Sequence, residues 1–191
     1  MEWLPIYIAD TLNHRVRKIT VSTGIITTIA GNEYRSYNGD DMAATDAQLS
    51  SPSDVAVDVM GNVYIADSEN FKVRKISIST GMIATIAYLS NPRGITLDGL
   101  GNLYMVDASL NLVIKTSESG GMFTYIAGIG SHDYNGDDIV ANFAAVAYVE
   151  CSLITNVATT DPLANVATTY PLAETRRSWF PINFQLVTGK A

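Results

Sequence analysis

The sequence predicts an all-β fold built from repeated units of four short antiparallel strands. The first observation is a repeat: Tyr7–Asp10 recurs as Tyr64–Asp67 and, 40 residues later, as Tyr104–Asp107. The second is composition, because each unit alternates short β-branched runs with glycine-containing turns. The third is that no 3.6-residue apolar period runs through the unit, which argues against helix. We expect no helix inside residues 62–87.

The second copy defines the elements most clearly. Its strands are expected at about 53–58, 62–67, 72–78 and 82–87. Glycine at the turns supplies a positive φ, and the aspartates are expected to accept hydrogen bonds from turn amides. The predicted turn residues are Asp10, Asp58, Gly61, Asp67, Gly81, Asp98, Gly101 and Asp107. Four such strands in about 40 residues are typical of one β-propeller blade.

The repeat also predicts how the chain is divided. The propeller segment covers 1–138, and an irregular, low-complexity tail without assigned function covers 139–191. Tyr134–Asp138 repeats Tyr37–Asp41, so the second connector begins as the first does. The expected parts are a partial blade at 6–30 that lacks its first strand, a connector at 31–52 that lies outside the blades, blades at 53–87 and 93–127, and the start of a connector at 128–138.

The segment Gly61–Ile76 resembles an NHL repeat, and Tyr7–Ile19 is similar to the same family signature. Tyr37–Pro52 resembles the Gly-Asp-rich connector of one NHL subgroup, although Asp41-Met42-Ala43 stands where that subgroup usually has Gly-Gly-Pro. The resemblance spans about residues 6–138. It implies a propeller of six blades, or about 240 residues at this repeat length. We therefore expect the missing blades either in cis, in a longer gene product, or through self-association.

Composition argues against nucleic acid, a membrane and a metal ion as partners. The chain has 19 acidic and 12 basic residues and a net charge of −7, which disfavours nucleic acid. It has no signal peptide and no apolar stretch near the roughly 20 residues of a membrane span, so no membrane partner is expected and the compartment is not assigned. Asn38–Asp41 lacks the acid spacing of a calcium loop, and His14 and His132 accompany no catalytic motif. No cofactor or metal is expected.

Two functions follow from the sequence. The first is a non-catalytic scaffold that binds a protein or glycan through the face formed by the connectors and the loops between second and third strands. Residues expected on this loop face are Asn13, His14, Arg15, Tyr34, Tyr37, Glu69, Asn70, Phe71 and Tyr134. The alternative is a fragment of a six-bladed enzyme, because the family resemblance extends to lyases and metal-dependent lactonases that act at the central channel. For that role the chain offers Asp54, Asp58 and Asp98 on or near first strands. Arg15, Arg17, Arg74 and Lys75 are expected to be solvated or paired with carboxylates.

Overall fold

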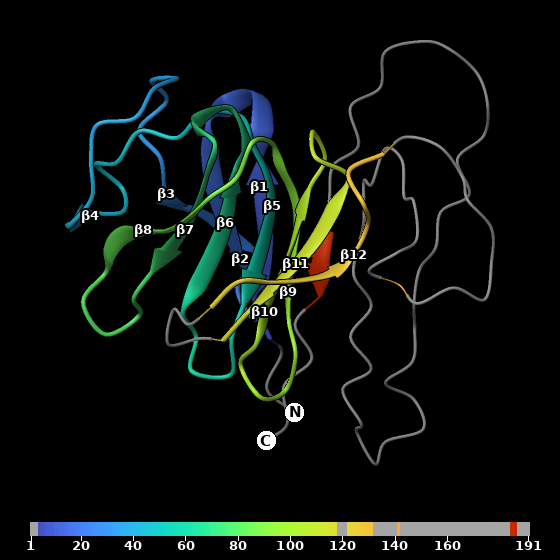
Figure 1. The fold of residues 1–191 in the computed structure, drawn as a ribbon. Coiled ribbons are helices and arrows are strands. Elements are labelled where there is room, and N and C mark those ends of the chain that lie inside the picture. Colours follow the sequence, from blue (N-terminus) through green and yellow to red (C-terminus); the bar gives the residue numbers. More distant parts are fainter. Residues whose placement is uncertain (1–3, 118–121, 132–140, 142–183, 187–191) are drawn as a thin grey trace, which may run out of the picture.

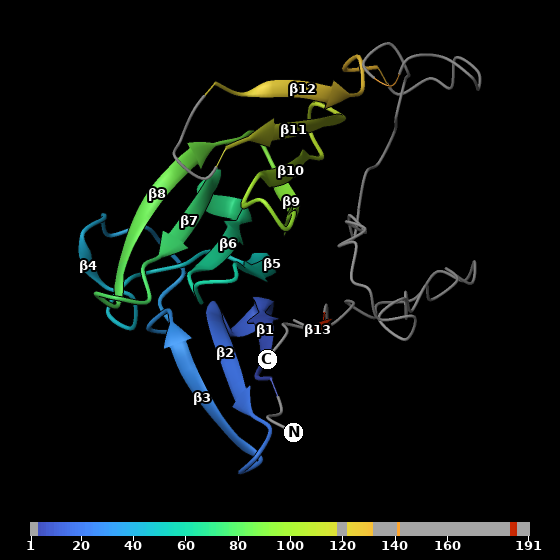
Figure 2. The ribbon, with the colours of Figure 1, turned by 90° about the horizontal axis from the view of Figure 1, so that it is seen from below.

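The computed structural model describes residues 4–117, 122–131, 141 and 184–186. This part of the chain is all-β and forms three antiparallel sheets, as the sequence predicts. Figure 2 shows the sheets side by side, spread like the blades of a fan, with the second sheet between the other two. We call them blades 1, 2 and 3 in chain order.

Each blade is a four-stranded antiparallel sheet, and blade 2 has a fifth strand. Blade 1 consists of β13 (Phe184–Leu186), β1 (Ile6–Asp10), β2 (Arg15–Thr20) and β3 (Ile25–Ala30). Blade 2 consists of β5 (Pro52–Val57), β6 (Val63–Asp67), β7 (Lys72–Ile76), β8 (Met82–Tyr88) and β4 (Met42–Ala43). Blade 3 consists of β9 (Pro92–Leu97), β10 (Leu103–Asp107), β11 (Leu112–Thr116) and β12 (Thr124–Ala127).

The structure corrects three expectations about these elements. The tail contributes β13, which pairs with β1 in the place of the first strand that blade 1 lacks. The connector does not lie wholly outside the blades, because Met42 and Ala43 pair with Ile83 and Met82 of β8. Residues 62–87 contain one 3-10 turn, Ser68–Asn70, where no helix was expected. An equivalent turn, Thr11–Asn13, follows β1.

The core lies between the sheets. One cluster joins blade 1 to blade 2 and includes three connector residues, Ala44, Ala47 and Leu49. A second cluster joins blade 2 to blade 3 through side chains such as Tyr64 and Met105. The strand β6 of blade 2 is therefore buried along its whole length, which explains its nearly continuous apolar sequence. In the described residues, no helix is long and apolar enough to cross a membrane.

Candidate functional site

The loops between the second and third strands form one end of every blade. Each loop contains a residue in the left-handed conformation at the same repeat position: His14 (φ 52°), Phe71 (φ 59°) and Asn111 (φ 51°). The connector runs over the same end, because the backbone N–H of Glu69 donates to the carbonyl of Ser50. Connector and loops thus share one face, which we call the loop face.

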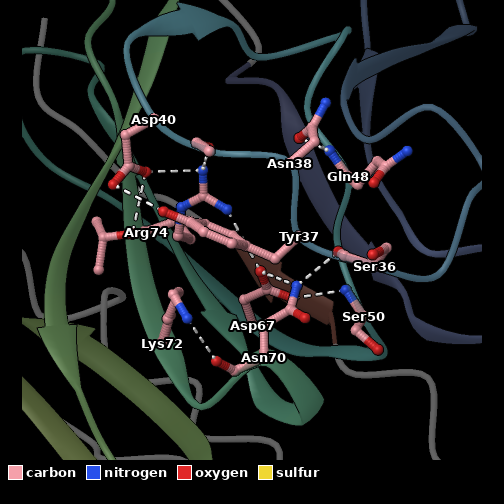
Figure 3. A network of polar contacts seen from close by, with 12 residues as sticks. Ser36, Tyr37, Asn38, Asp40, Gln48, Ser50, Asp67, Asn70, Lys72 and Arg74 are labelled. Carbon is pink, nitrogen blue, oxygen red and sulfur yellow. Dashed lines mark hydrogen bonds and ion pairs between the residues drawn. The ribbon is translucent and has the colours of Figure 1, made fainter.

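The first connector is anchored on blade 2 by a buried arginine (Figure 3). The Arg74 side chain is 0% exposed, and its Nη2 lies 3.0 Å from the Asp40 carboxylate and donates to the Gly39 carbonyl at 2.8 Å. Thr85 also donates to Asp40, and the Tyr37 ring lies 5.0 Å from the Arg74 guanidinium. A register shift in the β7–β8 pairing falls between Val73 and Arg74, and such irregularities re-aim side chains. The connector therefore covers a polar site on blade 2 that Arg74 and Thr85 provide.

Asp67 lies beneath this arginine and is itself 0% exposed. Its carboxylate accepts hydrogen bonds from the Ser50 amide at 2.7 Å and from Asn70 Nδ2 at 2.8 Å, and Arg74 Nη1 is 3.5 Å away. Burial raises the pKa of Asp67 to about 6, although these partners oppose the shift. The expectation that Asp67 caps its own turn is wrong, because it makes no side-chain cap on that turn. It links the connector to the blade instead.

The equivalent aspartates differ in their partners. Asp107 accepts from the turn amides of Ser109 and Leu110, as predicted, and also from the Ser90 amide. Asp10 does not cap its turn; it binds Asn13 at 2.8 Å and Arg17 at 3.4 Å. Asp10 and Asp67 therefore share an asparagine and an arginine partner, whereas Asp107 accepts from backbone amides.

Blade 3 has an open pocket where blade 2 has its connector. The pocket has a volume of about 550 Å³. Three of its lining residues, Leu110, Ile114 and Tyr125, stand at the repeat positions of Asn70, Arg74 and Thr85 in blade 2. The other lining residues are Phe71, Tyr88, Leu89, Ser90 and Asp107. Since the link from blade 2 to blade 3 is 17 residues shorter than the first connector, it leaves this site uncovered.

Most of the residues that the sequence assigned to the loop face have local partners. Arg15 pairs with Glu33, and His14 Nδ1 accepts from the Ser51 amide. Glu69 pairs with Arg35, and its hydrogen bonds from Ser51 and Ser50 help to lower its pKa. Asn13 donates a hydrogen bond to Asp10, Asn70 donates to Asp67 and to the Ser36 carbonyl, and Tyr37 donates to Asp40. Tyr34 and Phe71 are exposed. Tyr134 lies outside the described residues.

Sequence reasoning missed the pocket residues Tyr88, Leu110 and Tyr125, which are 73%, 45% and 59% exposed. The signal was present, because the third copy departs from the repeat at Leu110 and Tyr125, and Tyr88 of the second copy stands where the other copies have glycine. Leu110 replaces the asparagine of the first two copies, and Ile114 replaces their arginine.

The turn aspartates of the first hairpins lie outside the loop face. Asp58 accepts from the amides of Met60 and Asn62, and Asp98 does the same for Leu100 and Asn102. Asp54 on β5 accepts from Ile95 of β9 at 2.9 Å, and burial raises its pKa to about 7. Among the described residues, no group of three histidines, cysteines or acids could hold a metal ion.

Blades of four antiparallel strands in radial succession, joined by connectors on one face, define this part of the chain as a segment of a β-propeller. Residues 49–76 match the NHL repeat. This match and the blade architecture support the NHL-type β-propeller family that the sequence indicates.

Two proteins of known sequence are similar to part of this chain. Protein SUPPRESSOR OF QUENCHING 1, chloroplastic, of Arabidopsis thaliana is 32% identical over 76 residues, which are 40% of this chain and 7% of that protein. Human Teneurin-4 is 37% identical over an alignment of 84 positions that covers 37% of this chain and 3% of that protein. The chain thus spans a small part of the length of either relative.

Among solved structures, the nidogen–laminin complex contains a chain with a TM-score of 0.52 and 22% identity. The match covers 64% of this chain and 43% of that one. This likeness shows the fold alone.

Proposed function

We propose that this chain is a non-catalytic binding module that holds a protein ligand on its loop face, in the pocket between blades 2 and 3. The observation that carries the proposal is the aromatic lining of that pocket. Phe71 and Tyr125 are 57% and 59% exposed, and both border it. Fully burying one such side chain stabilises a complex by about 1.5–3 kcal/mol, so a few of them suffice for specific binding.

The comparison with blade 2 supports a peptide-like ligand. There the same positions receive the chain's own connector, whose Tyr37 ring packs over the site. In blade 3 the polar anchors are replaced by Leu110 and Ile114, which suits an apolar or aromatic side chain of a partner. Asp107 at the edge of the pocket already receives three backbone amides, so it does not demand a cationic ligand.

The enzyme alternative rests on Asp54. Its carboxyl group has a pKa of about 7, close to the range of a general acid or base. However, its two oxygens accept hydrogen bonds from Val55 and Ile95. This arrangement favours a carboxyl group that joins neighbouring blades.

Selection of phage-displayed random peptides on the immobilised 191-residue chain tests the proposal. We expect selected peptides to carry an aromatic residue and to lose at least about tenfold in affinity, or 1.4 kcal/mol, against Tyr125→Ser and Leu110→Asn. The second change restores the residue type of blade 2. Tyr34→Ser removes a similarly exposed ring outside the pocket and should leave affinity unchanged. Peptides that bind all three variants equally would contradict the pocket assignment.

A further inference from the structure

Blade 1 carries a second copy of the connector-binding site. Asp10, Asn13, Arg17 and Thr28 stand at the repeat positions of Asp67, Asn70, Arg74 and Thr85. The internal contacts also agree. Asn13 donates to Asp10 at 2.8 Å, as Asn70 does to Asp67, and the arginine–aspartate distances are 3.4 and 3.5 Å. The polar site is therefore already assembled in blade 1.

The two sites differ in whether a connector lies over them. The side chains of Arg74 and Asp67 are 0% exposed beneath the connector, whereas those of Arg17 and Asp10 are 25% and 24% exposed. In the described part of the chain, no connector lies on blade 1 as residues 31–51 lie on blade 2.

An apolar stripe accompanies the uncovered site. The first cluster buries four residues of blade 2 against blade 1 and the connector: Val63, Ile65, Ile76 and Ile83. Their counterparts in blade 1 are Ile6, Ile8, Ile19 and Ile26. Three of these are half-buried, and Ile26 is 46% exposed. This face of blade 1 is thus built to receive a connector and a neighbouring blade.

A matching connector occurs once more in the sequence. Tyr134–Asp138 repeats Tyr37–Asp41 residue for residue. The ends of the two connectors are also fixed alike: the Gly31 amide donates to the Ala44 carbonyl at 3.0 Å, and the Gly128 amide donates to the Ala141 carbonyl at 3.2 Å. By this correspondence, Tyr134 and Asp137 are the counterparts of Tyr37 and Asp40.

The second connector cannot reach blade 1 of its own chain. Asp137 precedes Ala141, whose carbonyl accepts from the Gly128 amide at the end of blade 3, by four residues, which span at most about 14 Å. Blade 2 lies between blades 1 and 3 (Figure 2), and two sheet-to-sheet spacings amount to roughly 20 Å. A second copy of the chain, with its blade 3 beside this blade 1, brings the connector within range.

We propose that blade 1 of one copy binds residues 134–138 of a second copy at the site formed by Asp10, Arg17 and Thr28. The contact is head-to-tail, so two copies that use it reciprocally close a ring. The described residues of each copy form three blades, so two copies together present six, the number that the family resemblance implies. The acidic connector also complements the positive charge of Arg17.

Light scattering of the 191-residue chain at about 1–100 µM tests the contact. We expect a mass twice the 20.6 kDa of one chain. Arg17→Asp and Asp137→Arg should each place like charges in the contact and shift dissociation at least tenfold toward monomer. A mixture of the two variants places opposite charges in both contacts and should restore the dimer. Arg93→Asp makes the same charge change at an exposed position of β9 and should leave the dimer intact.

Competition provides a second measurement that does not depend on how the variants fold. A synthetic peptide of residues 131–141 should lower the mass of the unmodified chain, and a scrambled peptide should not. A chain that is monomeric at 100 µM would overturn the proposal. So would a dimer that neither charge reversal nor the peptide disturbs.

Discussion

A paired aspartate and glycine close the first hairpin of blades 2 and 3. Gly61 and Gly101 have φ values of 91° and 80°, where a β-branched residue is strained. A Cβ on Gly61 would meet Ile78 only at ordinary contact distance, so the cost of substitution lies in the backbone.

We expect Gly61→Val and Gly101→Val each to lower the free energy of unfolding by roughly 1–3 kcal/mol, measured by urea denaturation. Gly99→Val is the matched control, because Gly99 lies in the same turn, without a positive φ and with open space around it. Equal stability of Gly101→Val and Gly99→Val would contradict the backbone explanation.

Asp54 predicts a pH dependence. Its pKa of about 7 in the folded chain lies above the ordinary 3.8, because burial disfavours the charge. Between about pH 4 and 7 the folded chain therefore holds this proton more tightly than the unfolded chain, and the contribution of Asp54 to stability falls as pH rises through that window. Above pH 7 its contribution is constant.

Asp54→Asn removes the titration and keeps an oxygen that accepts from Ile95. We expect the free energy of unfolding of the unmodified chain to fall more between pH 4.5 and pH 7.5 than that of the variant. Asp67, with a pKa of about 6, contributes in the same direction in both chains and cancels in the comparison. Parallel pH profiles for the two chains would show that Asp54 titrates normally.

At the scale of the elements, the connector turns one exposed site into a buried one. Arg74 and Arg17 have equivalent positions and each pairs with an aspartate of its own blade, but only Arg74 is covered by the connector and bonded to it. Removing one partner from a buried ionic network leaves an uncompensated buried charge, which destabilises the fold strongly. A partly exposed ion pair contributes little to the free energy of unfolding, because water screens it.

Arg74→Met should therefore destabilise the chain by about 3–5 kcal/mol, and Arg17→Met by about 0–1 kcal/mol. Thermal and urea unfolding of the two variants, at concentrations low enough to keep the chains monomeric, measure the difference. Similar losses for both would mean that the connector does not isolate Arg74 from water.

The blades could be predicted from the sequence because the residues that specify each turn lie close together in the chain. Gly61 and Asp58 specify a turn within a few residues, and the 40-residue period places each turn in a blade. The Arg74 network could not be predicted in this way, because its partner Asp40 lies 34 residues away on a connector of irregular path. The pairing of β13 with β1 joins residues about 180 positions apart, and a strand of three residues has no periodicity of its own.

At the scale of the whole molecule, hydroxyl groups join successive blades. Thr11 donates to the carbonyl of Pro52, and Ser68 donates to the carbonyl of Pro92, each time from the loop of one blade to the first strand of the next. Ala108 takes this position in blade 3 and has no hydroxyl to donate. Blade 3 therefore lacks the side-chain donor with which blades 1 and 2 hold their successors.

The chain closes blade 1 with a strand from its other end, and this predicts how a shortened chain behaves. Phe184–Leu186 pairs with Ile6–Ile8, so a chain that ends at residue 183 leaves β1 as an unpaired edge. The lost ladder contacts should lower the free energy of unfolding by about 1–3 kcal/mol, at about 0.5–1.5 kcal/mol for each net hydrogen bond.

The exposed edge should also promote strand-to-strand aggregation, because β1 carries apolar residues beside unpaired backbone groups. Urea unfolding and light scattering at sub-micromolar concentration measure the two effects. A chain that ends at residue 186 retains β13 and is the control, which should unfold as the full chain does. If both shortened chains were equally stable and equally free of aggregates, β13 would contribute nothing to blade 1, and β1 would have to be a stable edge without it.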